Sequence, residues 1–234
     1  MGKQQLVVLV HSGSRGLGES VLRNYMDQHF ANGVGADSFA AGEYLCGHDF
    51  AVRWAKANRE LIARRFVAAL GAETECLWDG CHNSITPSPP APLPSDGRGW
   101  PTGRVRVWVH RKGAVVAEDD AVVIPGSRSA FSYLVKPIGD GGSRAWSLAH
   151  GAGRKWTRNA ARLRMRERFG LHQLVQTPLG SRVVCEERDL LYEEAPGAYK
   201  NIEAVIQDLL DAGLVSLIAT FRPLLTYKTR KFHR

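Results

Sequence analysis

Covalent cross-links and membrane-spanning segments are the first features that this sequence lacks. Four cysteines occur among 234 residues, at the irregularly spaced positions Cys46, Cys76, Cys81 and Cys185. No apolar run is long enough to serve as a secretory signal or a membrane span, so we expect reduced cysteines, a cytoplasmic location and no membrane contact. Cys81-His82 lacks a second ligand pair at zinc-finger spacing, which argues against a zinc knuckle.

Acidic residues are also comparatively scarce. The chain has 23 Asp and Glu against 31 Lys and Arg, which gives a net charge of +8 and a pI near 9.6. This excess indicates a polyanionic partner, most often a nucleic acid or a nucleotide. One stretch is especially rich in arginine, with Arg154, Arg158, Arg162, Arg164, Arg166 and Arg168. For that stretch alone, a solvated helix face is an equally good interpretation.

Regular alternation of strands and helices is missing, as is any internal repeat, and this favours an α+β fold. Apolar periodicity and end signals predict helices at residues 17–30, 44–70, 157–169 and 201–212. Short β-rich or alternating runs predict strands at residues 6–10, 75–78, 104–109 and 121–124. Proline, serine and glycine dominate residues 87–103, which we expect to form a surface loop.

A glycine-rich turn follows the first apolar run and resembles the cofactor-binding turn of short-chain dehydrogenases. Such turns place a phosphate at a helix N-terminus. Here the spacing of Gly13, Gly16 and Gly18 is one residue short of that family's first interval. No second strand ending in an acidic residue follows the helix promptly, so the context that this motif needs is absent.

Three blocks place a histidine beside small or hydrogen-bonding residues, a combination that suits phosphate and metal chemistry better than packing. They are His11-Ser12-Gly13-Ser14-Arg15-Gly16, His82-Asn83 and His150-Gly151-Ala152-Gly153-Arg154. Glycine lets backbone N–H groups approach phosphate oxygens closely. Taken alone, the last block is better interpreted as a tight turn with a surface histidine.

These blocks belong to eight motifs which, in their order along the chain, resemble the RtcB family of RNA ligases. The others are Ala57-Asn58-Arg59, His110-Arg111-Lys112-Gly113-Ala114, Pro125-Gly126-Ser127, Glu193-Glu194-Ala195-Pro196 with Tyr199-Lys200, and Arg222-Pro223-Leu224 with Lys228. The closing residues 224–229 resemble a bacterial branch that is associated with a release-factor-like partner.

The resemblance implies mixed sheets with flanking helices in a single catalytic domain over residues 1–234. The implied enzyme joins RNA ending in a 2′,3′-cyclic phosphate or 3′-phosphate to RNA with a 5′-hydroxyl, as in RNA repair and tRNA splicing. GTP and Mn²⁺ are the implied cofactors, and the route passes through a guanylylated histidine and an RNA–GMP intermediate.

The same resemblance assigns roles to individual residues. His150 is the implied nucleophile, His11 and His82 are the implied manganese ligands, and Arg15 is placed to hold an RNA phosphate. The implied GTP contacts are His82, Asn83, Pro125, Gly126, Ser127, Arg128, Ser132, His150, Gly151, Ala152, Gly153 and Lys228.

The sequence departs from the family pattern before His11 and at Arg128. The Asp-x-x-Cys-Gly and Gly-x-Gly-Asn-His-Phe motifs, which supply the remaining metal ligands, do not occur. We therefore expect an N-terminally truncated domain. The alternative function is a catalytically impaired, GTP- and RNA-binding remnant of such a ligase. Arg128 stands where the family usually has methionine, and we expect it to add a cation near the phosphates.

Overall fold

The computed structural model describes residues 5–29, 33–87, 108–118 and 121–229. The chain divides into two units, residues 1–112 and 113–234. That they form one catalytic domain stays a prediction. Most of the expected loop at 87–103 lies outside the described residues, and Pro87 ends a strand. None of the helices in the described ranges is long and apolar enough to cross a membrane.

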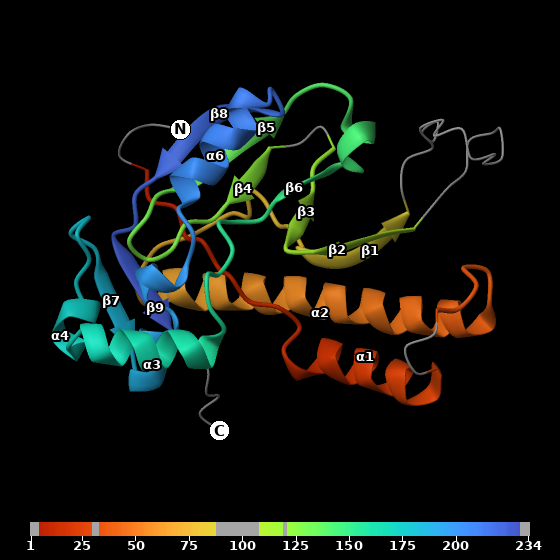
Figure 1. Ribbon diagram of the computed structural model, residues 1–234, viewed down its shortest axis with the longest axis horizontal. Coiled ribbons are helices and arrows are strands. Elements are labelled where there is room, and N and C mark those ends of the chain that lie inside the picture. The colour runs from red at the N-terminus through yellow and green to blue at the C-terminus, as the bar shows by residue number, and fades with distance from the viewer. Residues whose placement is uncertain (1–4, 30–32, 88–107, 119–120, 230–234) are drawn as a thin grey trace. The chain divides into compact units, whose positions relative to one another are not determined.

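Two helices dominate the first unit and lie side by side, α1 (Gly16–His29) and α2 (Phe39–Ala69) (Figure 1). Val21 of α1 lies against Gly47 of α2, where an added Cβ would come within 3.2 Å of its side chain. Both helices were expected. α2 begins earlier than its apolar pattern indicates, because the Ser38 side chain accepts a hydrogen bond from the first turn and caps the helix.

A β-hairpin completes the first unit, with β1 (Asn83–Pro87) antiparallel to β2 (Trp108–Lys112). The strand expected at 104–109 falls partly outside the described residues, and β2 begins at Trp108. The strands expected at 6–10 and 75–78 are wrong, since neither segment is in a strand. The first of these pairs with no strand of the described chain, and Leu6 is 80% exposed.

Short sheets form the centre of the second unit, as expected for an α+β fold (Figure 1). One sheet has the order β4-β5-β8, all antiparallel, from β4 (Val122–Ile124), β5 (Ser132–Pro137) and β8 (Val215–Phe221). β3 (Ala114–Val116) pairs antiparallel with β6 (Ser147–Ala149), and β7 (Arg182–Cys185) pairs parallel with β9 (Leu225–Lys228). The strand expected at 121–124 is therefore confirmed as β4.

Helices pack on these sheets and on one another. They are η1 (Gly141–Arg144), α3 (Arg158–Arg168), α4 (Leu171–Leu174), α5 (Arg188–Glu193), η2 (Pro196–Ala198) and α6 (Ile202–Asp211). α3 and α6 confirm the helices expected at 157–169 and 201–212. Met165 of α3 lies in a buried apolar cluster with Leu191 of α5 and Val183 of β7. Trp156, six residues after His150, packs against the same cluster.

Candidate active site

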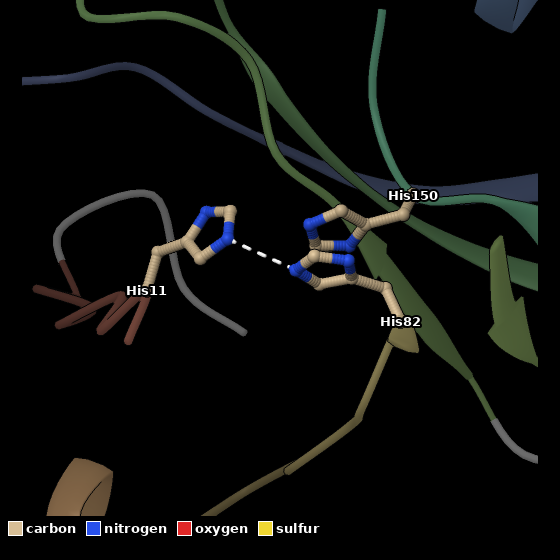
Figure 2. Close-up of side chains that lie close together, drawn as sticks. All are labelled: His11, His82 and His150. Atoms are coloured by element: carbon tan, nitrogen blue, oxygen red, sulfur yellow. Dashed lines mark hydrogen bonds between the residues drawn. The ribbon is translucent and has the colours of Figure 1, made fainter. Parts of the chain in front are cut away.

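His11 and His82 face each other in the first unit. Their Nε2 atoms lie 3.2 Å apart, and the two rings meet edge to face at 83° (Figure 2). Two imidazole nitrogens that bind one divalent metal ion at about 2.1 Å lie roughly 3.0 to 3.4 Å apart for bond angles of about 90 to 109°. The pair therefore fits as two adjacent ligands of a single metal ion.

The surroundings of His82 favour the neutral imidazole that a metal requires. Burial lowers the pKa of His82, and the positive charge of Arg59 lowers it further. Hydrogen bonds, including one with the Asn83 side chain, act in the opposite direction without reversing the shift. Near neutral pH the ring therefore has a nitrogen lone pair available for a metal.

Arg59 of α2 forms hydrogen bonds with both the loop that contains His11 and the loop that contains His82. Its guanidinium binds the Asp79 carboxylate through two hydrogen bonds, 2.6 Å from Nε and 2.7 Å from the second terminal nitrogen. The first terminal nitrogen donates to the Ser12 carbonyl over 3.0 Å. Ser12 follows His11 directly and Asp79 precedes His82 by three residues, so one helical side chain positions both predicted ligands. The sequence motif contained Arg59, but its partners could not be read from the sequence.

His48 and Cys81, which lie near these two loops in sequence or space, have structural partners. His48 of α2 accepts a hydrogen bond from the backbone N–H of Ile85 over 3.0 Å and thereby connects α2 with β1. The Cys81 thiol lies 3.2 Å from the Asn83 carbonyl, and all four cysteines are free. Within the described part of the chain, no thiol or carboxylate lies close enough to join His11 and His82 as a ligand. Arg15 is exposed and takes a left-handed backbone conformation directly before α1.

In the second unit, His150 follows β6 and leads into a turn formed by Gly151, Ala152 and Gly153, which we call the glycine turn. Its backbone N–H donates to the Gly113 carbonyl over 3.2 Å, which extends the pairing of β3 with β6. An added Cβ on Gly151 would lie 3.2 Å from the Pro125 carbonyl oxygen, and Gly153 has φ of +73°. The turn thus needs glycine, and it brings together two of the predicted nucleotide loops.

The loop from Pro125 to Ser132 is held in a tight conformation. A Cβ on Gly126 would lie only 2.0 Å from the Phe131 carbonyl oxygen, so that position excludes any side chain. The Gly126 N–H donates to the Ser132 hydroxyl over 3.0 Å, which shows that Ser132 shapes this loop. The sequence alone did not show whether the Ser132 hydroxyl binds the loop backbone or a nucleotide.

Arg128 is directed into the second unit. It is 4% exposed, and its guanidinium donates to the Leu191 carbonyl over 3.0 Å. The Arg128 carbonyl accepts from the Ser181 hydroxyl over 3.2 Å. Burial lowers the pKa of Arg128. The expectation that Arg128 adds a cation near the phosphates is therefore wrong: its guanidinium is buried and anchors the loop to α5.

Glu194 is the centre of a partly buried charge network that the sequence did not reveal. Its carboxylate contacts Arg154 at 3.0 Å, Lys228 at 3.4 Å and Arg158 at 3.7 Å, and accepts a short hydrogen bond from the Tyr199 hydroxyl. Burial alone would raise the pKa of Glu194, but Lys228, Tyr199 and Arg154 outweigh it and lower the pKa. The pKa of Tyr199 is raised by burial and by the adjacent carboxylate. Glu194 is thus ionised and Tyr199 is a neutral donor near neutral pH.

Comparisons with known proteins agree with the motifs. A family model described as tRNA-splicing ligase RtcB matches residues 1–229. The RNA-splicing ligase RtcB2 of Escherichia coli is 42% identical over 225 residues, which cover 96% of this chain and 56% of that protein. The tRNA-splicing ligase RtcB of Thermococcus kodakarensis is 30% identical over 263 residues, or 94% of this chain and 52% of its relative.

A mycobacterial relative shows the same extent of matching. The RNA-splicing ligase RtcB of Mycobacterium tuberculosis is 28% identical over 254 residues, which are 93% of this chain and 55% of the relative. The chain spans about half the length of these curated relatives. Because the family model covers nearly all of its residues, the chain belongs to the RtcB family of RNA-splicing ligases.

Proposed function

We propose that this chain carries the nucleotide-transfer chemistry of an RNA ligase that joins 2′,3′-cyclic phosphate or 3′-phosphate ends to 5′-hydroxyl ends with GTP and Mn²⁺. One observation carries the proposal most directly. His150 stands at the start of a glycine turn that lies against the Pro125 loop, within a single unit. A histidine beside two glycine-containing backbone turns suits attack on a nucleotide phosphate.

In the proposed first step, an imidazole nitrogen of His150 attacks the α-phosphorus of GTP. A P–N bond forms, the bond between the α-phosphorus and the bridging oxygen breaks, and pyrophosphate leaves. The proton on the other ring nitrogen passes to solvent or stays on the ring. The backbone N–H groups of Gly151, Ala152 and Gly153, with that of Ser127, are suited to the phosphate oxygens.

The later steps transfer GMP to RNA and then release it. Water opens a 2′,3′-cyclic phosphate by breaking its bond to the 2′ oxygen, which leaves a 3′-phosphate and a 2′-hydroxyl. A 3′-phosphate oxygen then attacks the phosphorus held by His150, and the P–N bond breaks. Finally the 5′-hydroxyl attacks the RNA 3′-phosphorus, loses its proton and displaces GMP. Atoms and charge balance at each step without any redox partner.

Two histidines of the first unit suit the implied manganese. His11 and His82 present nitrogens at a spacing that matches two ligands of one ion. When bound, manganese would neutralise negative charge on the nucleotide phosphates. Arg15 is exposed at the start of α1, where a guanidinium can bind two oxygens of an RNA phosphate. Asn83, Ser132 and Lys228 stay predicted nucleotide contacts, and the release-factor-like partner stays a prediction of the resemblance.

One observation favours the alternative of a catalytically impaired, GTP- and RNA-binding remnant. In the described ranges, the His11 and His82 pair is joined by no thiolate or carboxylate. Two imidazoles alone bind manganese weakly, because this ion prefers harder oxygen ligands. Binding of GTP and RNA would then survive while joining is lost.

A ligation assay separates the two functions. An RNA with a 2′,3′-cyclic phosphate end is incubated with a labelled 5′-hydroxyl RNA, GTP and Mn²⁺, and product length is read on a denaturing gel. We expect joined product from wild type and none from His150→Ala. Binding of GTP and RNA without joining would establish the remnant instead. Equal joining by both proteins would overturn the role of His150.

A further inference from the structure

We propose that Glu194 is a positioning residue, which holds Lys228 and the Arg154 end of the glycine turn in the arrangement that histidine guanylylation needs. Loss of Glu194 is expected to slow guanylylation without weakening GTP binding. This inference rests on the proposed function, because it assigns a task to Glu194 within the same nucleotide site.

Geometry makes Glu194 the link between three chain segments. One carboxylate oxygen pairs with Arg154, four residues after His150, and the other lies 3.4 Å from the Lys228 ammonium at the end of β9. The Tyr199 hydroxyl donates to the second oxygen. Glu194 itself directly follows α5, and its side chain is 12% exposed. A single carboxylate at this junction therefore fixes side chains that lie far apart in sequence.

The backbone connects the same segments independently. Lys200 N–H donates to the Gly153 carbonyl over 3.0 Å, and Lys155 N–H donates to the Ala198 carbonyl over 2.8 Å. Arg154 and Tyr199 form an isolated antiparallel bridge. The end of the glycine turn is thus bound twice: its backbone pairs with residues 198–200, and the Arg154 side chain pairs with Glu194. Removing the carboxylate loosens the turn while the backbone pairing keeps the unit folded.

The local charge explains why loss of Glu194 should lower the guanylylation rate without weakening GTP binding. Three cations, Arg154, Arg158 and Lys228, surround this one carboxylate, which leaves a net charge of +2 (three minus one). Replacing Glu194 with a neutral residue raises this to +3, which does not weaken the attraction of a triphosphate. The released cations repel one another, however, and lose their fixed positions. Misplacement by about 1 Å costs on the order of 100-fold in rate.

Single-turnover labelling with α-³²P-GTP and Mn²⁺ tests this inference in wild type, Glu194→Ala, Glu194→Gln and a control. For Glu194→Ala we expect a maximal rate lower by about 100-fold, with the half-saturating GTP concentration unchanged or lower. Glu194→Gln should retain part of the rate, since its amide oxygen still accepts from Tyr199. The control is Asp189→Asn, which removes a carboxylate that pairs with Arg162 and Arg166 of α3 rather than with Arg154 or Lys228. It should stay within twofold of wild type.

Two results would overturn the inference. A raised half-saturating concentration with an unchanged maximal rate would make Glu194 a direct nucleotide contact. Equal labelling rates for Glu194→Ala and Asp189→Asn would show that Glu194 is not a positioning residue. Thermal unfolding of each variant verifies that the protein is folded, and Glu194→Gln replaces Glu194→Ala if the latter does not fold.

Lysine acylation provides a readout that needs no guanylylation. Acetic anhydride is applied in short pulses, and Lys228 modification is compared by mass spectrometry with modification of Lys136, an exposed lysine of β5. Release of Lys228 in Glu194→Gln should raise its relative reactivity several-fold, whereas Asp189→Asn should not change it. Unchanged Lys228 reactivity would refute the inference. If wild type takes no label, the proposed function fails, and the acylation result still decides whether Glu194 holds Lys228 in place.

Discussion

Arg59 binds the Asp79 carboxylate at two points and the Ser12 carbonyl at a third, so a helix residue joins the loops of both predicted metal ligands. The guanidinium is a planar donor with a fixed fork geometry, whereas a lysine ammonium is a point charge. The arrangement therefore depends on the shape of the arginine as well as on its charge.

Arg59→Lys should weaken manganese binding by about 10- to 100-fold, the usual effect of removing a residue that orients metal ligands. Electron paramagnetic resonance of free Mn²⁺ during titration measures this affinity. Arg64→Lys is the matched control, because Arg64 lies on the same helix in an exposed ion pair with Glu60 and should have little effect. Equal affinities in Arg59→Lys and Arg64→Lys would show that the Arg59 contacts do not position the metal ligands.

The Glu194 network predicts a pH-dependent contribution to stability. Burial raises the pKa of Glu194, but its cationic and hydroxyl partners outweigh burial and lower it. A depressed carboxyl pKa stabilises the folded state above the unfolded value, about 4.3, and this contribution is lost as pH falls through the folded pKa. The difference in unfolding free energy between wild type and Glu194→Gln should thus be constant near neutrality and shrink below about pH 4. Urea unfolding across this range measures it, and a difference that grows on acidification would contradict the account.

Gly126→Ala should destabilise the second unit. The new methyl group would overlap the Phe131 carbonyl oxygen, so the loop must shift, at about 1–3 kcal/mol of unfolding free energy. We also expect loss of labelling by GTP, because the loop lies against the His150 turn. Gly42→Ala serves as the control: no atom lies within 4 Å of its Cβ, and alanine should stabilise that helical position by about 0.5–1 kcal/mol. Urea unfolding of both variants tests the contrast, which a stable and fully labelled Gly126→Ala would contradict.

The sequence predicted the elements whose signals are local. α1, α2, α3 and α6 combine apolar periodicity with end signals, such as the Thr157 hydroxyl that accepts from Ala160 at the start of α3. Residues 6–10 have strand-like composition, yet a strand requires a partner for its backbone groups, and composition does not reveal whether one is present. The predicted strand was therefore wrong for a physical reason.

The candidate site was predictable only in part for the same reason. The histidines were found because each stands in a motif with neighbouring glycine or polar residues. The partners that position them lie far away in sequence, as Asp79 does from Arg59 and Lys228 from Glu194. Such pairings depend on the folded path of the chain, so charge composition alone could not identify them.

Covalent labelling tests the central claim most directly. The purified chain and its His150→Ala variant are incubated with α-³²P-GTP and Mn²⁺, denatured, and examined for protein-bound label before and after acid treatment. We expect acid-labile label on wild type and none on the variant, because a phosphoramidate to His150 is the only proposed covalent link. Absence of label on a folded wild-type chain, or equal label on both proteins, would contradict it.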